Sequence, residues 1–208
     1  MKKPRIEQPS KTADGGAAGR VSLYGAAVEY GIHCMLWLIE PRAKPVSSRD
    51  LAELQGVPSA LMSRIMPKLE KAGLVTSISG ISGGYRLAKA PQDITVLEVV
   101  DAIDGGKGVF DCRNIRKNCV LFRGNAPTWI TSGVCGVHAV MLRAEKSMRN
   151  EMSRTSLLDL AMGFGELAPA DFGPNVGQWL DDRASNREIA RISAVRDSSR
   201  KRRRSTNE

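Results

Sequence analysis

The chain has 208 residues, 42% of them apolar, and a formal net charge of +9. This length accommodates one domain with a buried core plus additional segments. No apolar run approaches the roughly 18 residues that a membrane-spanning helix needs, and residues 1–20 lack the apolar centre of a signal peptide. We therefore expect a cytoplasmic protein without membrane contacts, and the net positive charge predicts a polyanionic partner.

The positive charge is unevenly distributed along the chain. Residues 1–20 contain five basic and two acidic side chains, and residues 184–208 contain eight and three. Both segments are polar, and we expect both to be disordered. Between them, residues 42–89 contain eight basic and three acidic side chains. This basic pole favours nucleic-acid binding, whereas the basic end either adds salt-dependent attraction to DNA or remains a solvated tail.

The first predicted elements are two helices. Leu23–Glu40 is largely apolar and predicts a helix. We expect this helix to end before Pro41. Residues 46–55, VSSRDLAELQ, predict a short helix with Ser47 or Ser48 as its cap.

A third helix is predicted within residues 56–74. Pro58 suits its first position and Gly73 suits its end. Pro67 lies inside this helix and removes one backbone hydrogen bond. We therefore expect a kink there and an effective helix of residues 58–66.

A hairpin and a fourth helix follow. Residues 75–91, VTSISGISGGYRLAKAP, predict two short strands around a Ser/Gly turn. In the next helix Thr95 and Glu98 form a capping-box pattern, and Gly105 marks the end.

A polar loop over residues 106–133 leads to a second long helix at about residues 134–152. The segment that follows, up to residue 183, is less regular. The apolar stripe of the long helix consists of Val137, Val140, Met141, Ala144, Met148 and Met152.

Three helices followed by a glycine-rich hairpin is the order of a winged helix-turn-helix. The predicted fold is therefore mainly α with a small β-hairpin wing over residues 21–105. In this fold the third helix enters the major groove and the wing approaches the sugar-phosphate backbone of double-stranded DNA. A winged helix that binds another protein is the alternative. The candidate DNA contacts are Ser48, Pro58, Ser59, Ser63, Arg64, Lys68, Ser79, Gly80, Gly83 and Tyr85.

Three of the four cysteines are clustered. Cys112, Cys119 and Cys135 have the spacing C-x6-C-x15-C, and His138 follows three residues later. Structural disulfides are not expected in a reducing cytoplasm. No C-x2-C pair is present, so the pattern is not that of a zinc ribbon. Thiolates in a flexible loop suit an iron–sulfur cluster, while Cys119 could instead be a bystander or a free sensor thiol.

A carboxylate and an imidazole lie in the apolar segment AVEYGIHCM of the first helix. Glu29 and His33 are four residues apart, which places both side chains on one helical face. Each also has a purely structural interpretation: Glu29 as an exposed helix charge, and His33 as a core histidine. The neighbouring Cys34 is expected to be a buried apolar residue.

The run LEKAGLVTSISGISGGYRLAKAPQDITVLEVVDAIDG, from Leu69 to Gly105, resembles the signature of the Rrf2-type bacterial transcription regulators. The resemblance covers about residues 21–165. It implies a homodimer with a winged helix-turn-helix and, over residues 134–183, a long dimerisation helix and C-terminal segment. Many members hold an iron–sulfur cluster in the loop before that helix. Some, such as IscR, NsrR and RsrR, respond to cluster status, nitric oxide or redox state.

Within the family, VEYGIHC and VGQWL resemble segments of RsrR. This resemblance implies a [2Fe-2S] cluster held by Glu29 and His33 of one subunit and by Cys112 and Cys135 of the other. The second possible set, three cysteines with His138, resembles other members. The wing departs from the family pattern because Ser79 and Ser82 stand where arginine is frequent.

The sequence therefore predicts a redox-sensing repressor that acts as a homodimer on an operator. It contains no motif for a small-molecule substrate, so we do not expect an enzyme. The alternatives are a regulator of the same fold that uses oxidisable thiols without a cluster, and one that contains structural zinc.

Overall fold

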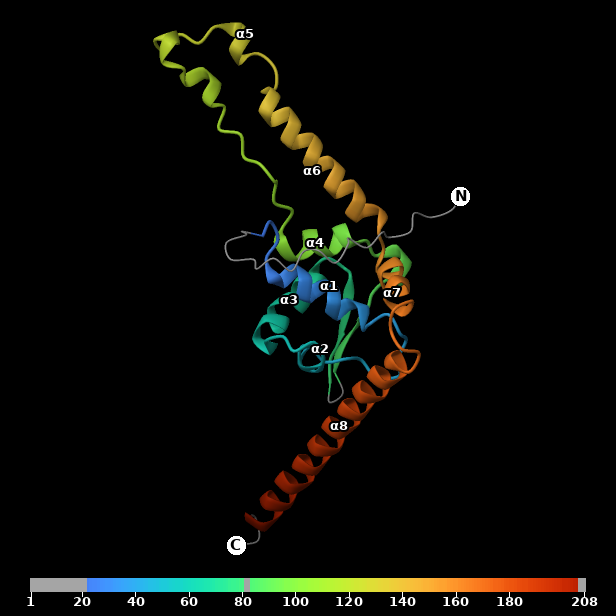
Figure 1. Cartoon of the computed structure of the whole chain (residues 1–208). Coiled ribbons are helices and arrows are strands. Elements are labelled where there is room, and N and C mark those ends of the chain that lie inside the picture. The colour runs from blue at the N-terminus through green and yellow to red at the C-terminus, as the bar shows by residue number, and fades with distance from the viewer. Residues whose placement is uncertain (1–21, 81–82, 206–208) are drawn as a thin grey trace.

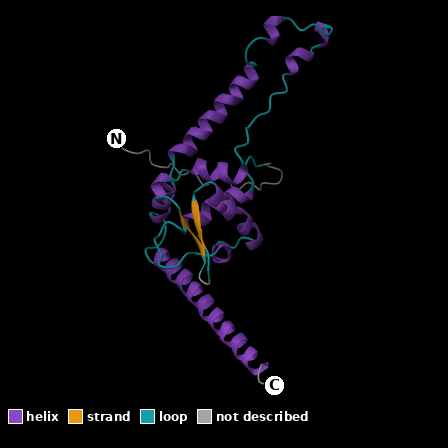
Figure 2. Cartoon of the chain, turned by 180° about the vertical axis from the view of Figure 1, so that it is seen from behind, coloured by secondary structure: helices purple, strands orange, loops and turns teal. Residues whose placement is uncertain are grey.

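The computed structural model describes residues 22–80 and 83–205; the predicted tail 1–20 lies outside the described residues. Within them the structure is mostly helical with one two-stranded antiparallel hairpin (Figures 1 and 2). The elements are α1 (Ala26–Leu36), α2 (Ser48–Leu54), α3 (Ser59–Lys71), β1 (Val75–Ile78), β2 (Gly84–Leu87), η1 (Pro91–Asp93), α4 (Val96–Asp104), η2 (Ile115–Asn118), η3 (Val120–Phe122), α5 (Thr128–Thr131), α6 (Gly136–Arg154), α7 (Leu157–Gly165) and α8 (Phe172–Ser205).

The core lies where α1 crosses α3 and α4. Gly31 makes the close approach possible, because a Cβ atom there would lie 2.2 Å from Cδ1 of Ile103 and 3.4 Å from Cγ2 of Ile65. Helix α1 is shorter than predicted, ending at Leu36. The next residue, Trp37, turns its ring onto Phe164 and Phe172, with centroids 5.8 and 6.0 Å away.

The helix-turn-helix follows the prediction except at the two ends of the third helix. Ser47, rather than Ser48, caps α2 by accepting the Asp50 N–H. Helix α3 starts at Ser59, with Pro58 in the cap position, and continues through Pro67 to Lys71. Its last turn persists because it buries Leu69 in the core, and tertiary packing outweighs the single lost hydrogen bond.

The hairpin is tied to the chain before α2. Strands β1 and β2 pair from Val75↔Leu87 to Ile78↔Gly84. Tyr85 also exchanges two backbone hydrogen bonds with Val46, at 2.8 and 3.1 Å. A Cβ atom on Gly84 would lie 2.5 Å from the Val46 carbonyl oxygen, so only glycine fits this crossing.

Two capping boxes face each other at the base of the long helix. The predicted box of Thr95 and Glu98 is present on α4, and a second one, formed by Ser156 and Asp159, starts α7. A backbone bridge joins Thr95 to Ser156. The start of α7 is thereby fixed beside the start of α4.

Residues 106–154 form a projection that we call the arm. The long helix α6 and the segment before it extend from the body together (Figure 1). At the base of the arm, Arg149 makes two hydrogen bonds to the carboxylate of Asp101, at 2.7 and 3.0 Å. The predicted long helix is confirmed as α6, and its outer half lies away from the core.

The carboxyl-terminal region differs from the prediction. Instead of an irregular segment and a disordered tail from residue 184, the structure has α7 and then the helix α8, which leaves the body opposite to the arm (Figures 1 and 2). Residues 206–208 of the predicted tail lie outside the described residues. The sequence after Gly177 contains neither glycine nor proline. Val176, Leu180 and Ala184 are buried and anchor the first turns. No helix in the described ranges is long and apolar enough to cross a membrane.

We predict that Gly84→Ala lowers the free energy of unfolding by about 1–3 kcal/mol, because the new methyl group would collide with backbone rather than with a movable side chain. Urea denaturation measures this. The control is Gly163→Ala inside α7, where nothing lies within 4 Å of the new methyl group. That change should be neutral or stabilise by up to about 1 kcal/mol. Equal effects of the two changes would contradict the argument.

Candidate functional site

The amino-terminal end of α3 presents several of the predicted DNA contacts. Pro58, Ser59 and Arg64 are exposed, and Ser48 begins the neighbouring helix α2. The Ser63 hydroxyl donates to the carbonyl of Ala60 at 2.9 Å, within the same turn. This surface can therefore offer a guanidinium and a hydroxyl group to a ligand.

Two predicted contacts have partners inside the protein. The Lys68 ammonium donates to the Ile103 carbonyl at 2.7 Å, near the carboxyl end of α4. Tyr85 is half-buried against the core, and burial raises the pKa of its phenol. The structure therefore gives Lys68 and Tyr85 structural tasks in the described state, and their contact with DNA stays a prediction.

The wing has the tight backbone that its glycines predicted. Gly80 has a φ of +124°, and the Gly83 N–H donates to the Gly80 carbonyl at 3.2 Å. Ser79 is exposed beside them, while Ser82 lies outside the described residues. Arg191 of α8 reaches the same Gly80 carbonyl at 3.4 Å, a contact with no local sequence signal because 111 residues separate the two.

The predicted acid and imidazole lie on the outer face of α1. Glu29 and His33 are both exposed, whereas the adjacent Cys34 is fully buried. Burial raises the pKa of the Cys34 thiol to about 12, and its Sγ lies 3.8 Å from the Leu51 carbonyl oxygen. Cys34 is therefore a core residue, as expected, and the other two side chains are accessible to a ligand.

Two contacts across the arm bracket Cys112 and Cys135. The ring of Phe110 lies 6.0 Å from that of His138, and the Arg116 guanidinium donates to the Gly133 carbonyl at 3.1 Å. Cys112 lies between Phe110 and Arg116 in sequence, and Cys135 lies between Gly133 and His138. The two cysteines therefore belong to facing segments at the outer part of the arm.

Cys135 occupies the cap position of α6. The backbone N–H groups of His138 and Val137 lower the pKa of its thiol, and Arg116 adds to the effect. A thiol at a helix amino terminus loses its proton readily, which suits a metal ligand or a reactive sulfur. Cys119 is exposed between two short 3-10 turns.

A complete ligand set is not assembled within one copy of the described chain. No group of three histidine, cysteine, aspartate or glutamate side chains lies close enough to hold a metal ion. The alternative set of Cys112, Cys119, Cys135 and His138 is therefore not gathered in this conformation. The favoured set is divided between the face of α1 and the arm.

The outer part of the arm also exposes an unusual amount of apolar surface. Val120 and Leu121 are 84% and 82% exposed. Soluble proteins rarely leave such a patch uncovered. The other members are Ile115, Trp129, Val134, Val137, Val140 and Leu142.

Comparison with known proteins identifies the family to which the chain belongs. The Rrf2 profile, described as "Iron-dependent Transcriptional regulator", matches residues 24–163. The chain belongs to the Rrf2 family. It is 30% identical to Protein rrf2 of Nitratidesulfovibrio vulgaris over 117 residues, 56% of this chain and 71% of that one. The protein is thus a DNA-binding transcriptional regulator with a winged helix.

Two further Rrf2 proteins extend the similarity. The regulator NsrR of Halalkalibacterium halodurans is 27% identical over 140 residues, which are 67% of this chain and 90% of that one. The solved structure of T. potens IscR superposes with a TM-score of 0.52 at 25% identity, covering 74% of this chain and 93% of that one. The first of these two is named as an HTH-type transcriptional regulator, the class of protein that the sequence predicted. The particular closeness to RsrR stays a prediction.

We predict that iodoacetamide alkylates Cys135 of folded, metal-free protein with a midpoint at lower pH than the same cysteine in urea-unfolded protein. The lowered pKa makes the thiolate abundant at lower pH. Mass spectrometry after labelling across a pH series measures this. Cys34 is the internal control, since it should be labelled only after unfolding. A midpoint for Cys135 at or above that of the unfolded protein would contradict the argument.

Proposed function

We propose that this regulator is a homodimeric, redox-sensing repressor that binds a [2Fe-2S] cluster between its subunits. The observation that carries the proposal is the division of the donors. Glu29 and His33 face outward on α1, while Cys112 and Cys135 lie on facing segments of the arm. Each copy thus offers two separate half-sites, one on α1 and one on the arm. The half-sites of a second copy can complete both.

The arm supports the homodimer. Its exposed apolar side chains include Leu121 and Trp129 at the tip and Val137 along α6. A second copy of the same arm is an apolar partner of matching length, and a two-fold arrangement would cover both patches at once. It would also carry the thiols of one copy toward the body of the other.

The donor chemistry fits the cluster. Cys135 supplies a thiol already disposed to lose its proton, and thiolates are the usual ligands of iron–sulfur clusters. Glu29 and His33 are one helical turn apart and accessible. When bound, the cluster would supply a one-electron redox change. Its potential would be raised by the imidazole and carboxylate, because they leave less negative charge than two thiolates.

The body offers a short path from this site to the DNA-binding surface. Helix α1 packs on α3 at Gly31, and α4 packs on both. A change in how Glu29 and His33 are held would shift α1 and, through this contact, the tilt of α3. Two operator half-sites lie about one DNA turn apart, so a small tilt changes how well a dimer fits both. The coupling would make operator affinity depend on the state of the cluster.

We predict complementation between two colourless variants. Glu29→Gln with His33→Gln, and Cys112→Ser with Cys135→Ser, should each abolish the visible chromophore of anaerobically purified protein. A heterodimer of the two retains one site with all four wild-type ligands if ligands come from both subunits. Coexpression with different affinity tags, followed by absorption spectra and iron and sulfide analysis, should then show about half the wild-type cluster content.

The controls are Cys119→Ala and His138→Ala, which should keep the spectrum. Colourless heterodimers would show that the ligands do not come from opposite subunits. If Cys119→Ala or His138→Ala abolishes the chromophore instead, the alternative ligand set is correct.

A cluster-free thiol sensor is the second candidate. The observation in its favour is that Cys135 combines a lowered thiol pKa with partial exposure, and Cys119 of the same arm is exposed. Such a regulator would be colourless without air and would lack iron and sulfide. Retained zinc in the same analysis would identify the structural-zinc alternative.

For the DNA-binding surface, we predict that Arg64→Ala weakens binding to an operator selected from a random duplex pool by about fivefold or more, since a good bidentate base contact is worth about 1–3 kcal/mol. Fluorescence anisotropy measures this at constant salt. Lys107→Ala is the matched control, because it removes the same charge from a side chain that is 73% exposed and pairs with Asp104 at the end of α4. Equal losses in both variants would show a general charge effect.

A further inference from the structure

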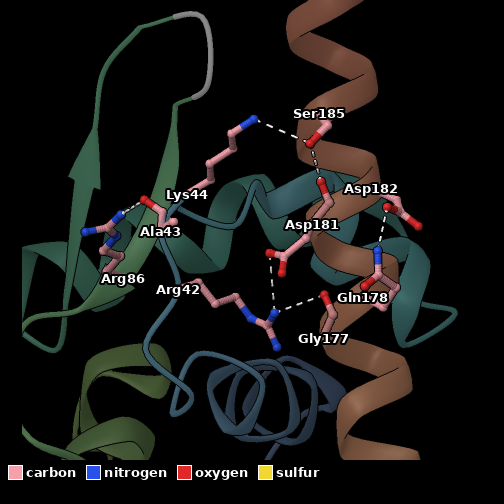
Figure 3. A network of polar contacts seen from close by, with 9 residues as sticks. All are labelled: Arg42, Ala43, Lys44, Arg86, Gly177, Gln178, Asp181, Asp182 and Ser185. Carbon is pink, nitrogen blue, oxygen red and sulfur yellow. Dashed lines mark hydrogen bonds and ion pairs between the residues drawn. The ribbon is translucent and has the colours of Figure 1, made fainter.

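Helix α8 is attached to the DNA-binding elements by a set of polar contacts. We use the term reading head for α2, α3 and the hairpin, with the connecting residues 41–46. Figure 3 shows α8 beside this connection: Arg42 donates to the Gly177 carbonyl at 3.0 Å and lies 3.5 Å from the Asp181 carboxylate. Lys44 reaches Ser185 at 3.4 Å and Glu188 at 2.7 Å.

The strongest attachment is a buried carboxylate on α2. Asp50 is only 2% exposed and forms an ion pair with Arg187, and Arg183 pairs with both Asp50 and Glu53. A buried charge separated from its partner is strongly destabilising, so these pairs hold α8 in one position on α2. Further along, Arg191 meets the wing at Gly80.

The charge of α8 changes after Arg191, the last of the contacts named above. Residues 172–191 contain three acidic and three basic side chains, and the acids include Asp181 and Glu188 of the attachment. Residues 192–205 contain six basic side chains and one acid. At 1.5 Å per residue these 14 residues extend about 21 Å past the wing contact. The attached part is therefore neutral and the projecting part strongly cationic.

We propose that the projecting end of α8 binds the phosphate backbone of operator DNA outside the half-site contacted by α3 and the wing. This inference rests on the operator binding proposed above and adds a third contact to it. The reading head is itself basic, so it does not attract this end of the helix. DNA that already lies against α3 and the wing is a polyanion, and it attracts the cationic end of α8. About 21 Å corresponds to about six phosphate steps along one strand.

The position of the helix makes this different from the attraction of a flexible tail. Because α8 is fixed to α2 and to the wing, its cationic end keeps one direction relative to the bound half-site. It also leaves the body opposite to the arm, so the surface proposed for the second copy does not cover it (Figures 1 and 2). The footprint on DNA would thus be longer than the reading head alone requires.

The test compares two duplexes and three proteins. Selection from a random duplex pool with wild-type protein first defines the operator. The short duplex contains only the selected site, and the long one has one further helical turn, about 10 base pairs, on each side. The charge variant changes Arg200, Lys201, Arg202, Arg203 and Arg204 to glutamine, and the break variant is Ser198→Pro, which keeps every charge but interrupts the helix between its wing contact and these five residues.

Wild-type protein should bind the long duplex at least about tenfold more tightly than the short one at low salt, with the salt dependence steeper by about 0.9 per additional phosphate contact. The charge variant should bind both duplexes like the wild type binds the short one. The break variant should lose most of the gain. Circular dichroism and gel filtration verify that both variants fold and keep the wild-type oligomeric state.

Four outcomes would overturn the inference. Equal affinity of wild type for both duplexes, or an unchanged gain in the charge variant, would show that α8 makes no flanking contact. An unchanged gain in the break variant would show that a rigid helix is not required. Tighter binding by the charge variant would show that α8 shields the reading head. Failure of the selection to enrich any sequence would instead refute operator recognition itself, independently of α8.

Discussion

The close packing of α1 on α3 and α4 is the constraint on which the rest of the structure depends. Gly31 leaves no room for a methyl group between these helices. The opposite side of α1 is consequently turned outward, with Glu29 and His33 on it, and the outer side of α3 presents Arg64. The candidate sensing surface and the candidate DNA-binding surface are thus two faces of one rigid core. A short mechanical link between them follows from packing alone.

Local signals were sufficient for the body of the fold. The capping box of Thr95 and Glu98 and the stop at Gly73 depend on residues a few positions apart, and both are present in the structure. The prediction that the third helix effectively ends before Pro67 was wrong. The missing hydrogen bond of Pro67 is a local loss of stability, whereas the burial of Leu69 stabilises the last turn through tertiary packing. The internal partners of Lys68 and Tyr85 were also invisible to local reasoning, since Ile103 and Val46 are distant in sequence.

The site and α8 show where sequence reasoning reaches its limit. Spacing correctly placed Glu29 and His33 on one face of the first helix, which the structure shows to be exposed, and Cys135 at the start of α6. Whether these side chains bind the same cluster depends on a second copy of the chain. The spacing of residues in one sequence does not show how two copies assemble. The composition of residues 184–208 predicted disorder because an arginine-rich helix cannot bury its own side chains. The buried Asp50, 137 positions from Arg187, supplies the anchor that composition cannot reveal.

The reciprocal caps of α4 and α7 have a mechanical consequence. The Val96 N–H donates to the Thr155 carbonyl and the Leu157 N–H to the Ile94 carbonyl, both at 2.9 Å, at the point where α6 ends. The arm therefore has a pivot built from backbone on both sides, and Arg149 on Asp101 adds a second fastening one turn along. A torque applied at the distant tip would therefore be carried through this joint to α4, which packs on α1 and α3.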